Sequence, residues 1–321
     1  MSRLLTTVTA ITVIASTYVN ADVPKVVADI APIHSLVSRV MDGIGEPKLI
    51  VPNETSPHDY RLRPADAQAI EDANLVFWMG EGLTPWMERA LEALNSDTDV
   101  LEFLALEDSV RLAFREGALF EAHDDHDDHD KDHDDHDDHD DHDDHAGHDH
   151  GEFDPHAWLS TSNAKTWLNV IAAKLSSVDP NNAGTYFANA SQARKELDAL
   201  DAEINAMLGP VRGGKFIVFH DAYQYFEAVY DIPASGAISL GDASDPSAAR
   251  IAEIANRIKT ENIDCVLSEP QFNARLVKTV MGATDAKTQV IDPIGFGIES
   301  GSSLYPKLIR SMAQSLVDCL K

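Results

Sequence analysis

Histidine and aspartate alternate along residues 123–150, which read HDDHDDHDKDHDDHDDHDDHDDHAGHDH. This stretch, called the tract below, holds ten of the chain's fourteen histidines together with fifteen aspartates. Imidazole is a good ligand for zinc, copper and nickel, and carboxylate helps to neutralise a divalent cation. A plain acidic linker or low-complexity drift would not need a histidine at almost every third position. The tract therefore predicts capture of divalent metal ions.

No apolar side chain in the tract is larger than that of Ala146, so it cannot form a core, and we expect it to be disordered. Its composition does not distinguish storage of metal from delivery, sensing or catalysis. The predicted low-affinity ligands are His123, His126, His129, His133, His136, His139, His142, His145, His148 and His150.

Outside the tract, three of the four remaining histidines follow predicted strands or lie in turns. His58 is in the loop after the second strand, His156 is in a turn after Pro155, and His220 follows a strand ending at Phe219. Ligands of parallel α/β sheets gather at the carboxyl ends of strands. Asp292 follows another strand, and three imidazoles with a carboxylate or a water suit tetrahedral zinc. The spacing has no HExxH-like signature, and a lone loop histidine is more often a surface residue.

Several nearby residues are given lesser roles. We expect His34 to be a surface or helix-start residue, and Glu54 is a candidate carboxylate beside His58. Three tryptophans are expected to pack around the site, namely Trp78, Trp86 and Trp158.

Strands alternate with helices on both sides of the tract, which indicates an α/β fold with parallel sheets covered on both faces. Strands are predicted at residues 25–30, 47–51, 75–79, 100–104, 215–219, 234–239, 265–267 and 289–291. Helices are predicted at residues 32–41, 64–73, 86–94, 162–175, 223–230, 245–259, 274–280 and 305–320.

A longer helix is predicted between these halves, at residues 179–209. Its apolar residues recur every three or four positions and form one stripe, made of Tyr186, Ala190, Ala193, Leu197, Leu200, Ile204 and Met207. A rigid connector between two domains explains this length, and a coiled-coil dimer face is the alternative. We expect an N-terminal lobe over 22–178 with a disordered loop at 121–152, and a C-terminal lobe over 210–321.

The first 21 residues predict an export signal. Arg3 is followed by a mostly apolar run from Leu4 to Ala15, with a small-residue cleavage site before Asp22. A membrane anchor is the alternative, but the run is too short to span a bilayer, and no later segment reaches that length. No cysteine lies near the cleavage point to carry a lipid. We expect a soluble periplasmic protein.

The net charge of the whole chain is −29, of which residues 121–152 contribute −16, leaving −13 elsewhere. This excess of acid argues against nucleic acid as a partner and suits a protein that attracts cations. The only two cysteines are Cys265 and Cys319. In an exported chain an even count predicts a disulfide, whereas zinc sites built on cysteine usually show close pairs such as CxxC.

Several motifs in the same order resemble those of the periplasmic zinc-binding proteins of ABC-type zinc importers. They are SPHDYRLRP at 56–64, PHAWLS at 155–160, VFHDAYQYF at 218–226, SEPQF at 268–272 and DPIG at 292–295. The similarity runs from about Val26 to the C-terminus and includes the charged histidine loop and both cysteines. It implies two lobes, each a (β/α) unit similar to a Rossmann fold, joined by a rigid helix, with the metal in the cleft between them.

The resemblance also implies the ligands and the partner. His58, His156 and His220 match the zinc ligands, and Asp292 matches the aspartate of related manganese proteins, where water often replaces it in zinc members. Relatives that carry manganese or iron place a carboxylate where His220 stands, and harder oxygen ligands favour those metals. We therefore expect a monomeric Zn2+ carrier, not an enzyme, that docks on an ABC-type permease. The alternatives are a manganese or iron carrier, a zinc hydrolase and a metal buffer.

Overall fold

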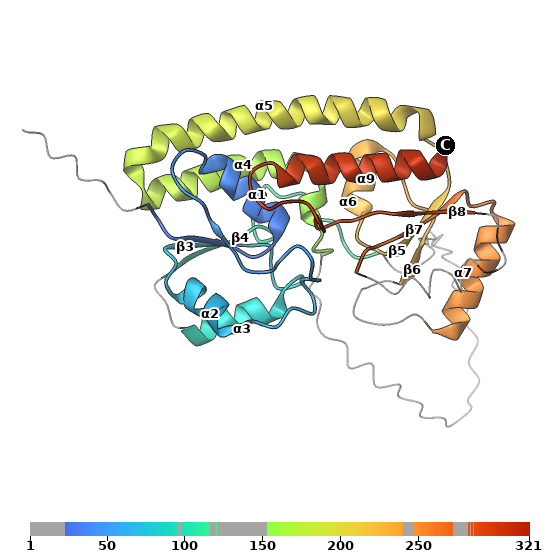
Figure 1. Cartoon of the computed structure of the whole chain (residues 1–321), viewed down its shortest axis with the longest axis horizontal. Coiled ribbons are helices and arrows are strands. Elements are labelled where there is room, and N and C mark those ends of the chain that lie inside the picture. The colour runs from blue at the N-terminus through green and yellow to red at the C-terminus, as the bar shows by residue number, and fades with distance from the viewer. Residues whose placement is uncertain are drawn as a thin grey trace, which may run out of the picture.

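Two parallel four-stranded sheets, each covered by helices, form the core of the computed structural model (Figure 1). The structure describes residues 23–94, 98–115, 120, 153–239, 247–271, 282, 284 and 286–321. The predicted export signal, the tract and the helix expected at residues 274–280 lie outside these residues. The predicted α/β fold class is confirmed.

The sheet of the N-terminal lobe has the strand order β2-β1-β3-β4, with every pair parallel. Its strands are β1 (Val26–Ala28), β2 (Lys48–Leu49), β3 (Leu75–Trp78) and β4 (Asp99–Glu102). All residues of β1 and β3 are buried, which explains why both read as unbroken apolar runs. β2 lies on one side of β1 and β3 on the other, so the order of successive strands across the sheet reverses at β1.

The sheet of the C-terminal lobe repeats this arrangement in the order β6-β5-β7-β8, again all parallel. Its strands are β5 (Phe216–His220), β6 (Ala237–Ser239), β7 (Cys265–Ser268) and β8 (Lys287–Val290). Here the strand order reverses at β5, which lies between β6 and β7. In open α/β sheets, ligands bind beyond the carboxyl ends of the strands at such a point.

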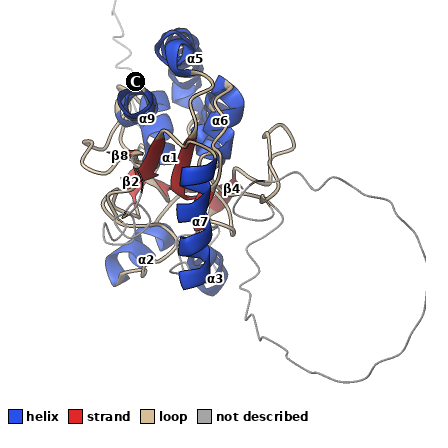
Figure 2. Cartoon of the chain, turned by 90° about the vertical axis from the view of Figure 1, so that its right-hand side faces the viewer, coloured by secondary structure: helices blue, strands red, loops and turns tan. Residues whose placement is uncertain are grey.

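Helices cover both faces of the sheets (Figures 1 and 2). The helices on one side are α1 (Ala31–Val40), α4 (Thr161–Val178), α5 (Ala183–Leu208), α6 (Gln224–Tyr230) and α9 (Leu304–Leu320). Those on the other side are α2 (Pro64–Glu71), α3 (Pro85–Leu94) and α7 (Ala248–Thr260). Short 3₁₀ turns flank α4 and α5, namely η1 (Ala157–Leu159), η2 (Pro180–Asn182) and η3 (Gly209–Val211).

Helix α5 spans the molecule from the first sheet to the second, as predicted for a connector (Figure 1). Its predicted stripe is buried except at the C-terminal end, where Met207 is only partly buried and its neighbour Leu208 is buried instead. The stripe packs on α4, α9 and α1 of the same chain. Because these helices already cover the apolar face, the coiled-coil alternative is wrong.

Ion pairs on the flanks of α5 fix it to the helices beneath. Arg39 of α1 binds Glu196 at 2.9 Å, and Arg310 of α9 binds Glu203 at 2.7 Å. Both pairs are exposed, where ion pairs contribute about 0–1 kcal/mol each, so the buried stripe supplies most of the stabilisation.

The predicted disulfide is confirmed. Cys265 at the start of β7 is bonded to Cys319 near the end of α9, with the two Cα atoms 5.7 Å apart. Both residues are buried. The bond ties the closing helix to a central strand of the second sheet.

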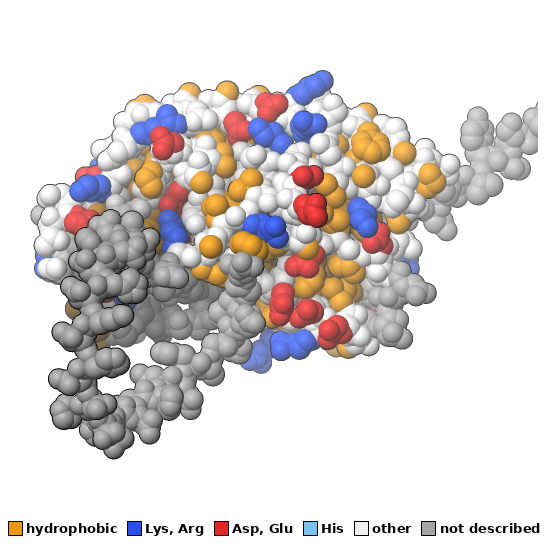
Figure 3. All heavy atoms as spheres, turned by 180° about the vertical axis from the view of Figure 1, so that it is seen from behind, with side chains coloured by type: hydrophobic (Ala, Val, Ile, Leu, Met, Phe, Trp, Pro, Cys, Tyr) orange, Lys and Arg blue, Asp and Glu red, His pale blue; other side chains and the backbone are white. Residues whose placement is uncertain are grey.

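Acidic and basic side chains are interspersed over the face opposite to that of Figure 1 (Figure 3). None of the helices in the described ranges is both long enough and apolar enough to cross a bilayer.

Candidate metal centre

His220 is the last residue of β5, at the switch point of the second sheet. The sequence predicts His220 just after the strand, but the strand includes it, so its backbone is held by the sheet. Glu269 follows the neighbouring strand β7, and its Oε1 lies 2.6 Å from Nδ1 of His220. Both residues are buried, with exposed fractions of 3% each. The carboxylate therefore fixes the orientation of the ring.

His156 has the same arrangement in the turn before η1. Its Nδ1 lies 2.7 Å from Oδ1 of Asp154, and the same oxygen accepts the backbone N–H of His156 at 2.9 Å. The ring also contacts Trp158, with a centroid distance of 5.2 Å. Since Asp154 is buried and receives both bonds, the His156 ring is as firmly oriented as that of His220.

These two histidines face each other with their remaining nitrogens. Nε2 of His156 lies 3.4 Å from Nε2 of His220. In a neutral imidazole whose Nδ1–H donates to a carboxylate, Nε2 carries a lone pair. Two lone pairs that point at each other repel, and a cation between them turns this repulsion into attraction. Zn–N bonds of about 2.0–2.1 Å at a tetrahedral angle put two ligand nitrogens about 3.3–3.4 Å apart, which matches the observed spacing.

His58 comes from the loop between β2 and α2 in the first lobe. Its ring centroid lies 5.6 Å from that of His156, and the side chain is half-buried. Trp86 supports the loop because its indole N–H donates to the carbonyl of Pro57 at 3.1 Å. Among the described residues, no three His, Cys, Asp or Glu side chains are already grouped as a metal would hold them. The rings of His58 and His156 are neighbours, and so are those of His156 and His220.

Asp292 lies in the loop after β8 and is half-buried. Its two oxygens accept the backbone N–H groups of Ile294 at 3.0 Å and Gly295 at 2.9 Å. Burial raises the pKa of Asp292 above its usual value, although these hydrogen bonds oppose the shift. The carboxylate caps the turn that follows it.

The same loop is joined to both halves of the site. The indole N–H of Trp158 donates to the carbonyl of Pro293 at 2.8 Å, and the amide of Asn53 donates to the carbonyl of Gly295 at 2.5 Å. Tyr223 is fully buried near Glu269 and Asp292, and burial together with these carboxylates raises its pKa well above the usual value. The Asp292 loop thus lies where the two lobes meet.

The sequence predicted His34 to be a surface or helix-start residue; it lies in the first turn of α1, as expected, but it is not on the surface. His34 is inside α1, only 8% exposed, with Nε2 3.0 Å from the carbonyl of Pro47. Burial lowers its pKa, and the ring links α1 to the segment before β2. Glu54 is exposed. The predicted ligands in the tract lie outside the described residues.

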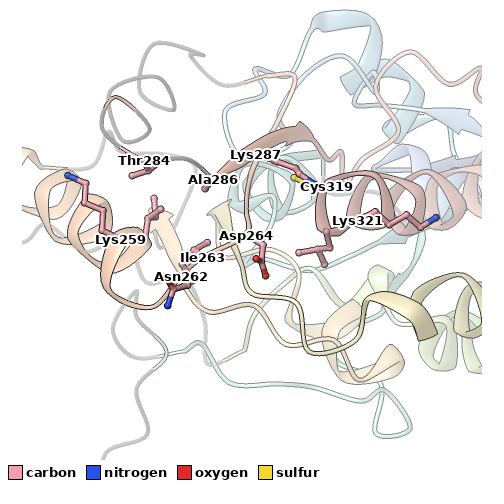
Figure 4. A pocket seen from close by; sticks show the side chains of 11 residues that line it. Lys259, Asn262, Ile263, Asp264, Thr284, Ala286, Lys287, Cys319 and Lys321 are labelled. Carbon is pink, nitrogen blue, oxygen red and sulfur yellow. The ribbon is translucent and has the colours of Figure 1, made fainter.

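Sequence reasoning missed Asp154 and Glu269, which orient the two central histidines. A signal for each was present, since Asp154 stands two residues before His156 and Glu269 stands two residues after the strand predicted at 265–267. A hollow of about 480 Å3 in the C-terminal lobe lies elsewhere (Figure 4). It is lined by the ends of α7 and α9 and by Cys319, and its described walls include no histidine.

Comparison with known proteins identifies the class of this protein. A sequence model of the family described as "Zinc-uptake complex component A periplasmic", ZnuA, matches residues 26–319. The chain therefore belongs to the ZnuA family, a family of zinc-uptake components and not of enzymes. The resemblance stated from the motifs is confirmed.

Relatives with assigned names agree. The chain is 47% identical over 304 residues to the "High-affinity zinc uptake system protein ZnuA" of Brucella abortus (strain 2308), covering 92% of this chain and 91% of the relative. It is 44% identical over 303 residues to the protein of the same name from Paracoccus denitrificans (strain Pd 1222), covering 94% and 93%.

Solved structures share the fold. A "Crystal structure of ZnuA" superposes with a TM-score of 0.73 at 22% identity, covering 94% of this chain and all of the other. The solute-binding protein FpvC from Pseudomonas aeruginosa, in complex with Mn2+, also gives 0.73 at 22% identity, covering 92% and 98%.

Proposed function

We propose that the protein captures Zn2+ at His58, His156 and His220 and delivers it to the permease of an ABC-type zinc importer. Zinc is the cargo here. The observation that carries the proposal is the 3.4 Å approach of two Nε2 atoms, each on a ring held from behind by a carboxylate. Family membership and relatives named for high-affinity zinc uptake support the choice of cargo.

The donor set favours zinc over manganese. Imidazole nitrogens are borderline ligands that suit zinc, whereas manganese prefers carboxylate and carbonyl oxygens. His220 supplies a nitrogen from the position at the end of β5, and its oriented lone pair faces His156. We propose Asp292 or a water for the fourth position. Asp292→Asn distinguishes them: a water-completed site keeps its affinity, and an aspartate ligand loses at least tenfold.

The remaining parts of the proposal concern the chain outside the site. Residues 1–21 direct export and are removed, residues 22–178 and 210–321 are the lobes, and residues 179–209 join them. The mature protein is a periplasmic monomer. The tract at residues 123–150 collects zinc weakly and raises its concentration near the centre. The stiff helix α5 limits lobe motion to a small tilt, because its buried face packs along both lobes.

The test is calorimetric titration of the full chain and of a variant lacking residues 123–150 with zinc, manganese and copper. We expect one tight zinc to remain after the deletion, and His220→Ala to abolish it. A matched control is His34→Gln, which changes a histidine bonded within the first lobe. Loss of all zinc binding on deletion of the tract would instead identify a buffer. Hydrolysis of an ester by the zinc-loaded chain, lost in His220→Ala, would identify a hydrolase.

A further inference from the structure

Arg115 joins two buried carboxylates beside the metal centre. Its Nε lies 2.9 Å from Oδ2 of Asp221, its Nη1 lies 2.8 Å from Oε2 of Glu227, and its Nη2 bonds to both residues. Asp221 and Glu227 are 7% and 6% exposed. Buried carboxylates need such a partner, and the planar guanidinium binds two of them with fixed geometry.

Arg115 and its two partners come from different parts of the fold. Asp221 follows His220 directly, and Glu227 is in α6 of the C-terminal lobe. Arg115 lies in the segment that leaves the N-terminal lobe after β4, where Val110 N–H donates to Asn163 of α4 at 2.8 Å. The bond between Arg115 and the carboxylates therefore crosses from one lobe to the other.

Four more hydrogen bonds attach this segment and residues 153–156 to α6. Together, residues 110–115 and 153–156 are called the strap, and a bridge between Ala113 and Phe153 joins its two halves. Gln224 donates to the carbonyl of Ala113 at 3.0 Å and to Oδ2 of Asp154 at 2.7 Å. The Tyr225 hydroxyl accepts from Leu112 N–H at 2.9 Å and donates to the carbonyl of Asp154 at 2.8 Å.

His156 is the last residue of the strap. Its orienting partner Asp154 is the residue that Gln224 and Tyr225 of α6 hold. His220 lies one residue before the carboxylate that Arg115 binds. The two facing imidazoles are thus linked through the protein by few contacts. Arg115 binds the residue next to His220, and Gln224 binds the carboxylate that orients His156.

We infer that Arg115 is a positioning residue for zinc, which fastens the strap to α6 and so keeps Nε2 of His156 opposite Nε2 of His220. This inference rests on the proposed ligands. The direction in which zinc affinity changes when Arg115 is removed distinguishes this positioning role from a simple charge effect. Removing a positive charge beside a cation site would by Coulomb's law alone tighten zinc binding. Loosening the strap would weaken it, mainly by faster release, because a misaligned pair of ligands holds the ion less well.

The experiment measures the zinc dissociation constant and release rate of the full-length protein by competition with a strong chromophoric chelator, which removes zinc from weak sites. We expect Arg115→Ala to raise the zinc dissociation constant at least tenfold. Arg115→Lys should retain part of the affinity that Arg115→Ala loses. Gln224→Leu removes two hydrogen bonds to the strap without a change of charge, and we expect it also to raise the zinc dissociation constant. Arg310→Ala breaks an arginine–carboxylate pair between α9 and α5 and serves as the matched control.

Zinc binding by Arg115→Ala that equals or exceeds that of the unmodified protein would overturn the inference. If Arg115→Ala does not fold, Gln224→Leu decides, and an unchanged dissociation constant in that variant overturns it. His220→Ala in the same assay separates the two proposals. If that variant still binds zinc tightly, the proposed centre is wrong; if it loses zinc while Arg115→Ala keeps it, only the positioning role is wrong.

Discussion

The carboxylate of Glu269 lies 2.6 Å from Nδ1 of His220, on the edge of the ring opposite to the nitrogen that faces His156. His220 is the last residue of β5 and Glu269 directly follows the neighbouring strand β7, so the sheet itself sets this contact. A Nδ1–H that donates to the carboxylate selects the tautomer whose Nε2 lone pair can bind a metal, and it makes that nitrogen more basic. The second oxygen accepts from Gln271 at 3.1 Å, which holds the carboxylate in place.

Replacing Glu269 should weaken zinc binding. We expect Glu269→Ala to raise the zinc dissociation constant about 10–100-fold, because the ring loses the partner that orients it. Glu269→Gln keeps an acceptor and should lose less. The measurement is chelator competition, with the exposed Glu203→Ala as control. Equal affinity in Glu269→Ala and the unmodified protein would show that the contact is irrelevant to the metal.

Zinc affinity should fall as the solution becomes more acidic. An imidazole must give up its proton to bind a metal, so protons compete with zinc at each histidine ligand. With more than one such ligand, we expect the dissociation constant to rise more than about tenfold for each pH unit below the histidine range. Titrations from pH 7.5 to pH 5 test this. Tight binding that persists unchanged at pH 5 would rule out imidazole ligation.

Asp29 should make the stability of the fold depend on pH. It follows β1, is fully buried, and accepts the N–H groups of Ile30 and Met79, both at 2.8 Å. Burial raises its pKa to about 7. The unfolded carboxyl loses its proton near pH 4, so between about pH 4 and 7 only the folded state holds it, and the contribution to the free energy of unfolding falls as pH rises.

Asp29→Asn removes this titration. Relative to the variant, the unmodified protein should therefore lose about 2–4 kcal/mol of stability between pH 4 and pH 7.5. Urea unfolding at several pH values measures it, with the exposed Asp318→Asn as control. A constant difference between Asp29→Asn and the unmodified protein across this range would contradict the prediction.

The disulfide should stabilise the fold without acting at the metal centre. Cys265 and Cys319 are 54 residues apart, and closing a loop of that length is worth about 4 kcal/mol in the chain-entropy account. We expect the double variant Cys265→Ser, Cys319→Ser to lose about that much in guanidinium unfolding and to retain one tight zinc. A loss below about 1 kcal/mol would mean that the packing of α9 alone holds the helix.

Much of the fold follows from local patterns. The buried apolar runs of β3 and β5 read as strands because strands covered on both faces need no polar alternation. The stripe on α5 gave the length of the connector, because one helix face recurs every three or four residues. The predictions were less accurate where tertiary contacts override local propensity. β2 is only two residues long, and His34 is buried, with its ring bonded to the carbonyl of Pro47.

The sequence by itself determined which residues carry metal-binding chemistry: the imidazoles are few outside the tract, and His220 stands at the end of an apolar strand. Only the tertiary structure decided that His156 and His220, 64 residues apart, face each other at 3.4 Å. It also decided which carboxylates serve them, Asp154 and Glu269, and that Arg115 reaches across to Asp221. The physical reason is that a strand or helix pattern records which face of an element is buried, whereas the distance between two side chains depends on how separate elements pack together.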